Sequence, residues 1–180
     1  MINVVANRYA EALFQIGEEE KLTDKLYQEL SEVVGLIETN NDLFSILKSP
    51  VISKKEKISL IDSIFTNKID INIKNFLKIL IEQNRISFIP DMAASYKELL
   101  NEKNNILEGF AISAIPMNKK EIKELEEKLS QKYNKNVTLE NKVDKSILGG
   151  VLVRLGNEEI DGTVKNRLDK MKEQLSQVIS

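Results

Sequence analysis

The sequence predicts a mainly α-helical protein in which an N-terminal bundle of six helices precedes a small α+β domain with a short sheet. Two observations lead to this fold class. Apolar residues recur every three or four positions as far as about residue 105, which is typical of amphipathic helices joined by short loops. From Ile106 onward, short segments rich in β-forming residues alternate with helical segments, which is typical of an α+β domain. We therefore expect two domains, residues 1–105 and 106–180.

Several helices of the first domain have a recognisable signal at one end. Ser53 and Glu56 form a capping box that opens the fourth helix. Pro50 ends the third helix, because the residue before a proline avoids the helical region. Ser87 is expected to cap the sixth helix and to place Pro90 in its first turn, where the missing N–H costs nothing. The expected core positions of the second, third, fourth and sixth helices are Leu22, Leu26, Leu30, Val33, Ile37, Leu43, Phe44, Leu47, Ile58, Ile61, Ile64, Phe65, Met92, Tyr96, Leu99 and Leu100.

Two helices of this domain carry more apolar surface than a surface helix needs. A stripe a little over about 100° wide is enough for packing on a core. The helices expected over residues 3–19 and 70–85 each have an apolar arc of about 200°, the second centred on Ile79. Ala12, a small residue at the edge of the first arc, would let another helix come close. One interpretation is that both arcs are buried in the bundle, and the other is that the surplus binds a helix of another protein.

The second domain is expected to contain four strands and two helices. The first strand covers residues 106–115, with Ile106, Phe110, Ile112 and Ala114 on one face. Further strands are expected over residues 136–143, 151–155 and 158–161, the last two joined by a tight turn at Gly156-Asn157. Asn118 caps the first helix, and Asp161 or Thr163 caps the second. The apolar residues of the last helix follow a strict 4-3-4-3 spacing: Val164, Leu168, Met171, Leu175 and Val178.

The composition argues against catalysis and against binding of nucleic acid. The chain of 180 residues has no Cys and no His, and its formal net charge is −2. It therefore lacks a thiolate nucleophile, a histidine base, the usual zinc ligands and a strong field that would attract phosphates. No apolar run reaches the roughly 18 residues that span a bilayer, and the opening residues do not resemble a signal peptide. We expect no catalytic, cofactor or metal site, and a protein that is cytosolic or held at a membrane by its partners.

Three regions of the sequence carry motifs of one known family. The first is ANRYAEALF at residues 6–14, similar to A-x-x-Y-A-x-A-x-F. The second combines NFL at residues 75–77 with NRI at residues 84–86. The third runs from DKS at residues 144–146 through GGV and DGT to RL at residues 167–168, similar to D-x-S-x-x-G-G-V…G…D-G-S…R-L, with Thr163 where serine is usual. Over nearly its full length the chain thus resembles the delta subunit of bacterial F-type ATP synthase, the relative of the mitochondrial oligomycin-sensitivity-conferring protein.

This resemblance implies a non-catalytic stator connector, which joins the catalytic head to the peripheral stalk so that proton-driven rotation is coupled to ATP synthesis. In this family the N-terminal domain binds the N-terminal helix of an alpha subunit in a groove between its first and fifth helices. The C-terminal domain binds the b subunits of the stalk. In this chain the groove would be lined by Tyr9, Ala12, Ile16, Phe76 and Ile79, with Gln83 at its polar edge. The resemblance further implies one copy per complex, no cofactor, and a peripheral location on the cytoplasmic side of the cell membrane.

Two other functions remain open from the sequence. The chain could be a stand-alone helical adaptor or regulatory protein, which co-purification with ATPase subunits would distinguish from a stator connector. It could also be a small hydrolase that works with carboxylates, although the chain has neither the usual base nor a phosphate-binding glycine loop. An activity screen of the purified protein would test that hypothesis.

Overall fold

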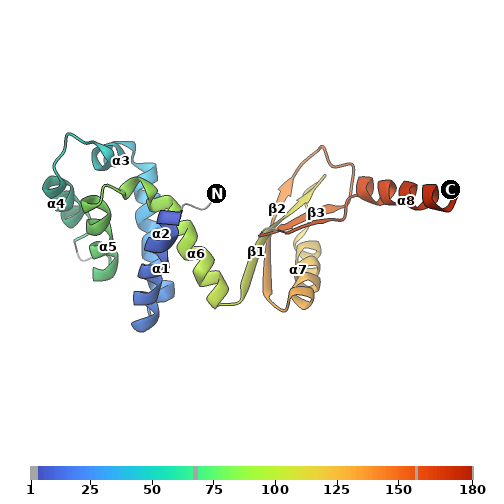
Figure 1. Ribbon diagram of the computed structural model, residues 1–180, viewed down its shortest axis with the longest axis horizontal. Coiled ribbons are helices and arrows are strands. Elements are labelled where there is room, and N and C mark those ends of the chain that lie inside the picture. Colours follow the sequence, from blue (N-terminus) through green and yellow to red (C-terminus); the bar gives the residue numbers. More distant parts are fainter. Residues whose placement is uncertain (1–3, 67–68, 157, 180) are drawn as a thin grey trace. The chain divides into compact units, whose positions relative to one another are not determined.

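The computed structural model describes residues 4–66, 69–156 and 158–179, and the side chains of these residues as far as Lys172. The structure is mainly helical and contains one four-stranded sheet, as the sequence predicts (Figure 1). The chain divides into two compact units, Met1–Leu100 and Asn101–Ser180, and each has its own hydrophobic core.

The first unit consists of helices packed around an aromatic centre. Its elements are α1 (Val4–Glu19), α2 (Thr23–Thr39), α3 (Asn41–Lys48), α4 (Lys54–Ile64), α5 (Ile71–Glu82), the short 3-10 helix η1 (Ile86–Phe88) and α6 (Ile89–Lys103). Tyr96 of α6 is fully buried, edge-on to Phe14 at 5.4 Å between ring centroids and stacked on Tyr27 at 6.2 Å. Its hydroxyl donates a hydrogen bond to the backbone carbonyl of Thr23, and burial raises the pKa of Tyr96 to about 12. Tyr96 therefore ties α6 to α1 and α2.

The ends of α4 and α6 show where the local signals in the sequence hold and where one fails. Ser53 opens α4 with the predicted capping box, and Pro90 lies in the first turn of α6 as predicted. The prediction that Ser87 caps α6 is wrong, because Ser87 lies inside η1 and α6 follows directly at Ile89. The N–H of Ile89 already donates to the carbonyl of Ile86. A 3-10 turn that runs into an α-helix satisfies this donor without a capping side chain.

The second unit is a sheet with a helix on one face. Its elements are β1 (Ile106–Ser113), α7 (Lys119–Tyr133), β2 (Asn136–Val143), β3 (Val151–Leu155), β4 (Glu158–Asp161) and α8 (Val164–Ile179). The strand order is β2-β1-β3-β4, with β1 and β2 parallel and the other neighbours antiparallel. Helix α7 opens with a capping box at Asn118 and makes the crossover between the parallel strands (Figure 1). Leu129 of α7 packs in one cluster with Val137 and Leu139 of β2.

The buried face of β1 is the one that carries its small residues. Ala111 is fully buried and Ser113 is 4% exposed, whereas Phe110 on the other face is 36% exposed. This central strand thus packs its small residues inward. At Gly109, a Cβ atom would lie 2.3 Å from the carbonyl oxygen of Arg154, so the close approach of β3 admits only glycine. The prediction that Ile106, Phe110 and Ile112 share one face is confirmed, and Ala114 follows the end of the strand.

Two predictions in the second unit extend beyond the described residues. Gly156 follows the end of β3 with a φ of 56°, as a tight turn needs, but Asn157 lies outside the described part of the chain. The side chains of Leu175 and Val178 also lie outside it. The cap of α8 is Thr163, whose hydroxyl accepts a hydrogen bond from the N–H of Asn166 at 3.3 Å.

Candidate partner-binding surfaces

Helix α5 is held at both ends by residues next to it in the sequence. Asp70 caps its start and accepts a hydrogen bond from Lys25 Nζ of α2 at 2.8 Å. The Lys25 ammonium, together with the backbone donor at the cap, holds the pKa of Asp70 below its usual value. At the other end Asn84 has a φ of 55°, and the N–H of Arg85 donates to the carbonyl of Leu80 at 2.7 Å. This is the bond pattern of a Schellman motif, which stops the helix and directs the chain away from its axis.

Helix α1 packs antiparallel to α5, and polar contacts join the two helices near both ends. Arg85 Nη1 donates to the hydroxyl of Tyr9 at 2.9 Å, and the guanidinium lies 5.3 Å from the ring centroid. At the opposite end, Asn72 Nδ2 donates to Glu20 Oε2 at 2.7 Å. From Tyr9 to Glu20, a rise of 1.5 Å per residue gives about 16 Å. The surface between the two helices therefore has a fixed length.

The residues predicted to bind a partner lie along this surface, which we call the α1–α5 face: Tyr9, Ala12 and Ile16 of α1, and Phe76, Ile79 and Gln83 at α5. Within each helix these residues are three or four positions apart. That spacing keeps side chains on one side of a helix, where a neighbouring helix can pack against them.

Exposure separates the α1–α5 face into a base and an open part. Phe76 is only 7% exposed and meets the ring of Tyr9 edge-on, with 6.4 Å between centroids. By contrast, Ile16 is 39% exposed and Ile79 is 47% exposed. Ala12 and Gln83 are exposed as well. The interpretation in which both wide arcs are buried inside the bundle is therefore wrong for Ile16 and Ile79. That a partner helix binds here stays a prediction.

The opposite side of α5 is charged and packs on α4. Lys74 Nζ and Lys78 Nζ lie 2.8 Å and 3.0 Å from Asp62 Oδ1 of α4. Hydrogen bonds from these two ammonium groups hold the pKa of Asp62 below its usual value. The lysines of α5 are thus paired within the unit, and the α1–α5 face itself consists of apolar and uncharged residues.

A second exposed apolar surface lies on α8. Val164, Leu168 and Met171 are 43%, 51% and 58% exposed, and their spacing of four and three residues aligns them along the helix. The start of α8 is held in place, because the N–H of Val164 donates to the carbonyl of Gly149 at 3.0 Å. At Gly150, which has a φ of 82°, a Cβ atom would lie 2.4 Å from the carbonyl oxygen of Gly162. The two-glycine motif thus lets the loop pack directly on the residues that precede α8.

Two exposed residues at the same end of the sheet were missed by the sequence argument. Leu148 is 83% exposed and lies in the loop before β3, and Ile115 is 74% exposed and follows the end of β1. Large apolar residues within polar turn sequences were the available signal, but loop residues have no periodicity that reveals their exposure.

The described residues offer neither a metal site nor a membrane-spanning helix. Within residues 4–66, 69–156 and 158–179, no group of three or more potential ligands could hold a metal ion. In the same part of the chain, no helix combines the length and the apolar character that crossing a bilayer demands.

Comparison with known proteins decides the family. The family model described as ATP synthase delta (OSCP) subunit matches residues 5–175. The chain belongs to this family. The resemblance inferred from the sequence motifs is therefore confirmed, and the delta subunit is a structural subunit of F-type ATP synthase, not a catalytic one. The hypothesis of a small hydrolase is wrong, and the full-length match favours the ATP synthase role over a stand-alone adaptor.

Curated relatives match this chain from end to end. The ATP synthase subunit delta of Clostridioides difficile (strain 630) is 64% identical over 181 residues, which is 100% of both chains. The ATP synthase subunit delta of Alkaliphilus oremlandii (strain OhILAs) is 40% identical over 179 residues, which is 99% of each chain.

Solved structures share the fold at lower sequence identity. A chain in the cryo-EM structure of the Toxoplasma gondii mitochondrial ATP synthase hexamer aligns with a TM-score of 0.72 at 20% identity, covering 96% of this chain and 98% of that one. A chain in a cryo-EM structure of Polytomella F-ATP synthase aligns with a TM-score of 0.52 at 19% identity, covering 57% and 92%. At such identities the likeness shows the fold alone.

Proposed function

We propose that this chain joins the catalytic head of an F-type ATP synthase to the peripheral stalk through two separate surfaces. The α1–α5 face binds the N-terminal amphipathic helix of the alpha subunit, and α8 binds the b subunits. The observation that carries this proposal is the exposure of Ile16 and Ile79 beside the partly buried Tyr9 and the buried Phe76. Membership of the delta family supports it.

The dimensions of the α1–α5 face suit a short helix. A length of about 16 Å accommodates about three turns at 1.5 Å per residue. Covering the exposed part of Ile16 or Ile79 is worth about 1 kcal/mol each, and the apolar residues of the partner contribute in the same way. The affinity for a helix that is bound in this way comes mainly from a low dissociation rate. Slow dissociation suits an interface that must stay bound while the rotor turns.

The exposed stripe of α8 suits a helical partner of a different kind. Its spacing of four and three residues averages 3.5, which is the repeat of a left-handed coiled coil. A long helix of a b subunit can pack along such a stripe from Val164 onward. We propose one copy of the chain per complex, located at the cytoplasmic side of the cell membrane and held there by these partners.

A single substitution tests the first surface. Ala12→Asp places a carboxylate in the middle of the α1–α5 face, where a bound helix would bury it without a partner. We expect the affinity for a peptide of the alpha subunit's N-terminus to fall at least about 100-fold in isothermal titration calorimetry. The matched control is Ala94→Asp, at an alanine that is also exposed but lies in α6, away from this face.

The control variant should bind the peptide as the unaltered chain does, and circular dichroism should show that both variants stay folded. Unchanged affinity of the Ala12→Asp variant would sink the assignment of the α1–α5 face.

A further inference from the structure

The exposed apolar stripe of α8 is narrow and has a basic residue on each side. At about 100° per residue, Val164, Leu168 and Met171 lie within an arc of about 60°. Arg167 lies about 40° beyond the edge that Met171 forms, and Lys172 lies about 40° beyond the edge that Leu168 forms. All of these residues are exposed. Positive charge therefore borders the stripe along both sides.

These basic residues occupy the positions that select partners in coiled coils. When Leu168 is an a residue and Met171 is a d residue of the heptad, Arg167 is a g residue, and Lys165 and Lys172 are e residues. Every e and g position in this part of α8 is therefore basic. Side chains at e and g lie beside the apolar seam, where they meet the flanking residues of the partner helix.

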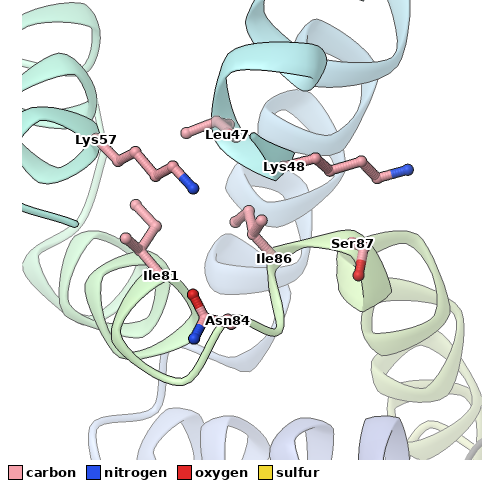
Figure 2. Close-up of a pocket in the computed structure, with 7 residues that line it drawn as sticks. All are labelled: Leu47, Lys48, Lys57, Ile81, Asn84, Ile86 and Ser87. Carbon is pink, nitrogen blue, oxygen red and sulfur yellow. The ribbon is translucent and has the colours of Figure 1, made fainter. Parts of the chain in front are cut away.

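Several basic residues of the first unit have partners within that unit. Lys74 and Lys78 pair with Asp62. Lys48 lines a small pocket that Lys57 also lines (Figure 2). Its ammonium lies 3.7 Å from the ring centroid of Phe44. The charges of these residues are therefore used inside the unit.

Arg167 differs from these residues. In the part of the chain whose side chains are described, no carboxylate lies within ion-pair distance of its guanidinium. Asp169 lies about 100° beyond the edge of the stripe, on the far side of the helix. The chain as a whole has a formal net charge of −2, so the basic border is a local feature of α8.

We propose that α8 binds a helix that has apolar residues at its own a and d positions and aspartate or glutamate at the positions beside them. This inference rests on the proposed function, because it names the chemistry that α8 requires of a stalk helix. Since both borders of the stripe are basic, the requirement holds for a parallel and for an antiparallel partner. Exposed ion pairs add little affinity, so these charges mainly decide which helix binds and how fast it associates.

Two other occupants fit the stripe less well. A second copy of this chain would bring basic residues against basic residues along the seam, and like charges at these positions oppose pairing. An acidic lipid surface suits a helix with a broad apolar face. An arc of about 60° is instead the narrow seam of a coiled coil.

The test measures binding of the full-length chain to two synthetic helical peptides, each about four heptads long with leucine at a and d. One peptide has glutamate at every e and g position, and the other has lysine. We expect calorimetry at low salt to show at least about ten-fold tighter binding of the glutamate peptide, through the sum of several flanking pairs. Higher salt should reduce this preference.

Two double variants locate the preference on α8. Arg167→Glu combined with Lys172→Glu should reverse the preference, so that the lysine peptide binds more tightly. The matched control is Lys128→Glu combined with Lys170→Glu, which changes the net charge equally at exposed positions away from the stripe. The control should keep the preference of the unaltered chain, and circular dichroism should show that both variants stay folded.

A pull-down with b subunits separates failure of this inference from failure of the proposed function. If b subunits bind the chain only when α8 is present but bind Arg167→Glu with Lys172→Glu equally well, the proposed function stands and the acidic partner is wrong. If b subunits bind a chain without α8, the proposed function fails for this helix.

Three further results would each overturn the inference. One is equal affinity for the two peptides, or no binding of the glutamate peptide. Another is a dimer of the unaltered chain in sedimentation that Leu168→Asp dissociates, which would assign the stripe to a second copy. The last is binding to vesicles of phosphatidylcholine and phosphatidylserine that is tighter than binding to the glutamate peptide, which would assign α8 to a membrane surface.

Discussion

The α1–α5 face and the stripe on α8 are both apolar and exposed, but they are built differently. The α1–α5 face lies between two helices of one core, with Phe76 nearly buried at its base and polar contacts joining the helices near both ends. The α8 stripe lies on a single helix whose start is tied to the loop before β3, and Leu168 and Met171 are each more than half exposed. The first surface is formed by two packed helices of the isolated chain, whereas the second, in the proposed assignment, is completed by a helix of the b subunits.

This difference predicts how substitutions on each surface affect folding and partner binding. Residues of the α1–α5 face should affect both folding and binding, because they belong to a core. Residues of the α8 stripe should affect binding alone, because their side chains contribute little to the isolated chain. The two surfaces also lie in separate units, so each should lose its own partner without affecting the other.

The largest effect is expected from removing α8. A chain that ends at Thr163 keeps the hydrogen bond between the N–H of Gly162 and the carbonyl of Val151, so the sheet retains its contacts. We expect this truncated chain to lose all detectable binding to b subunits in a pull-down. Its affinity for the alpha-subunit peptide should stay within about two-fold, because the surfaces are independent. Loss of both partners together would show that the surfaces are not separable.

The next largest effect concerns stability. Phe76→Ala should lower the free energy of unfolding by about 3–5 kcal/mol, because it opens a cavity under Tyr9. Leu168→Ala on α8 should change it by less than about 0.5 kcal/mol, as for other exposed positions. Urea unfolding followed by circular dichroism measures both values. A similar cost at the two positions would mean that α8 packs on the chain as firmly as α5 does.

One substitution on each surface tests whether the α1–α5 face and the α8 stripe bind different partners. Ile79→Asp should weaken binding of the alpha-subunit peptide about 30-fold or more, and Leu168→Asp should do the same for the b subunits, because each buries an unpaired charge at one interface. Calorimetry with each partner should find the other affinity unaltered in both variants. If either variant weakened both interactions, the assignment of one partner to each surface would fail.

The smallest effect concerns the ion pair at the start of α5. The hydrogen bond from Lys25 holds the pKa of Asp70 below the ordinary value of an aspartate. The ion pair therefore stabilises the fold at pH values above that ordinary pKa, and this stabilisation is lost as the pH falls through the lower, folded-state pKa. Asp70→Asn should therefore cost less than about 1 kcal/mol near neutral pH, since Lys25 is largely in water. In urea unfolding at a series of pH values, that cost should shrink below pH 4; a cost that grows on acidification would contradict this mechanism.

Much of this molecule follows from local patterns in its sequence. Capping at Ser53 and Asn118, the spacing along α8 and the excess apolar width of α1 and α5 depend on neighbours within one helix, where periodicity is informative. The exposure of Ile79 followed from that excess, because a helix with a core on one side cannot bury an arc of about 200°.

Features set by distant contacts were not predictable in this way. The inward face of β1 depends on the approach of β3 at Gly109, which no pattern within the strand reveals. The role of Ser87 depends on η1, a turn without a distinctive sequence signature. Lys57 stands four residues before the buried Ile61, so helical spacing placed it on the core side of α4. Only the packing of α3 and α5 around it shows that it lines a small pocket.

The contact between Arg85 and Tyr9 has a consequence for the order in which the ATP synthase complex assembles. The Arg85 guanidinium fixes the position of the Tyr9 ring in the isolated chain. Binding of a partner at this ring therefore costs little side-chain conformational entropy. A receptor that is ready in advance can be filled as soon as the alpha subunit is made. Under the proposed assignment, α8 gains its helical partner only when the b subunits are present, so we expect the head to bind this chain before the stalk does.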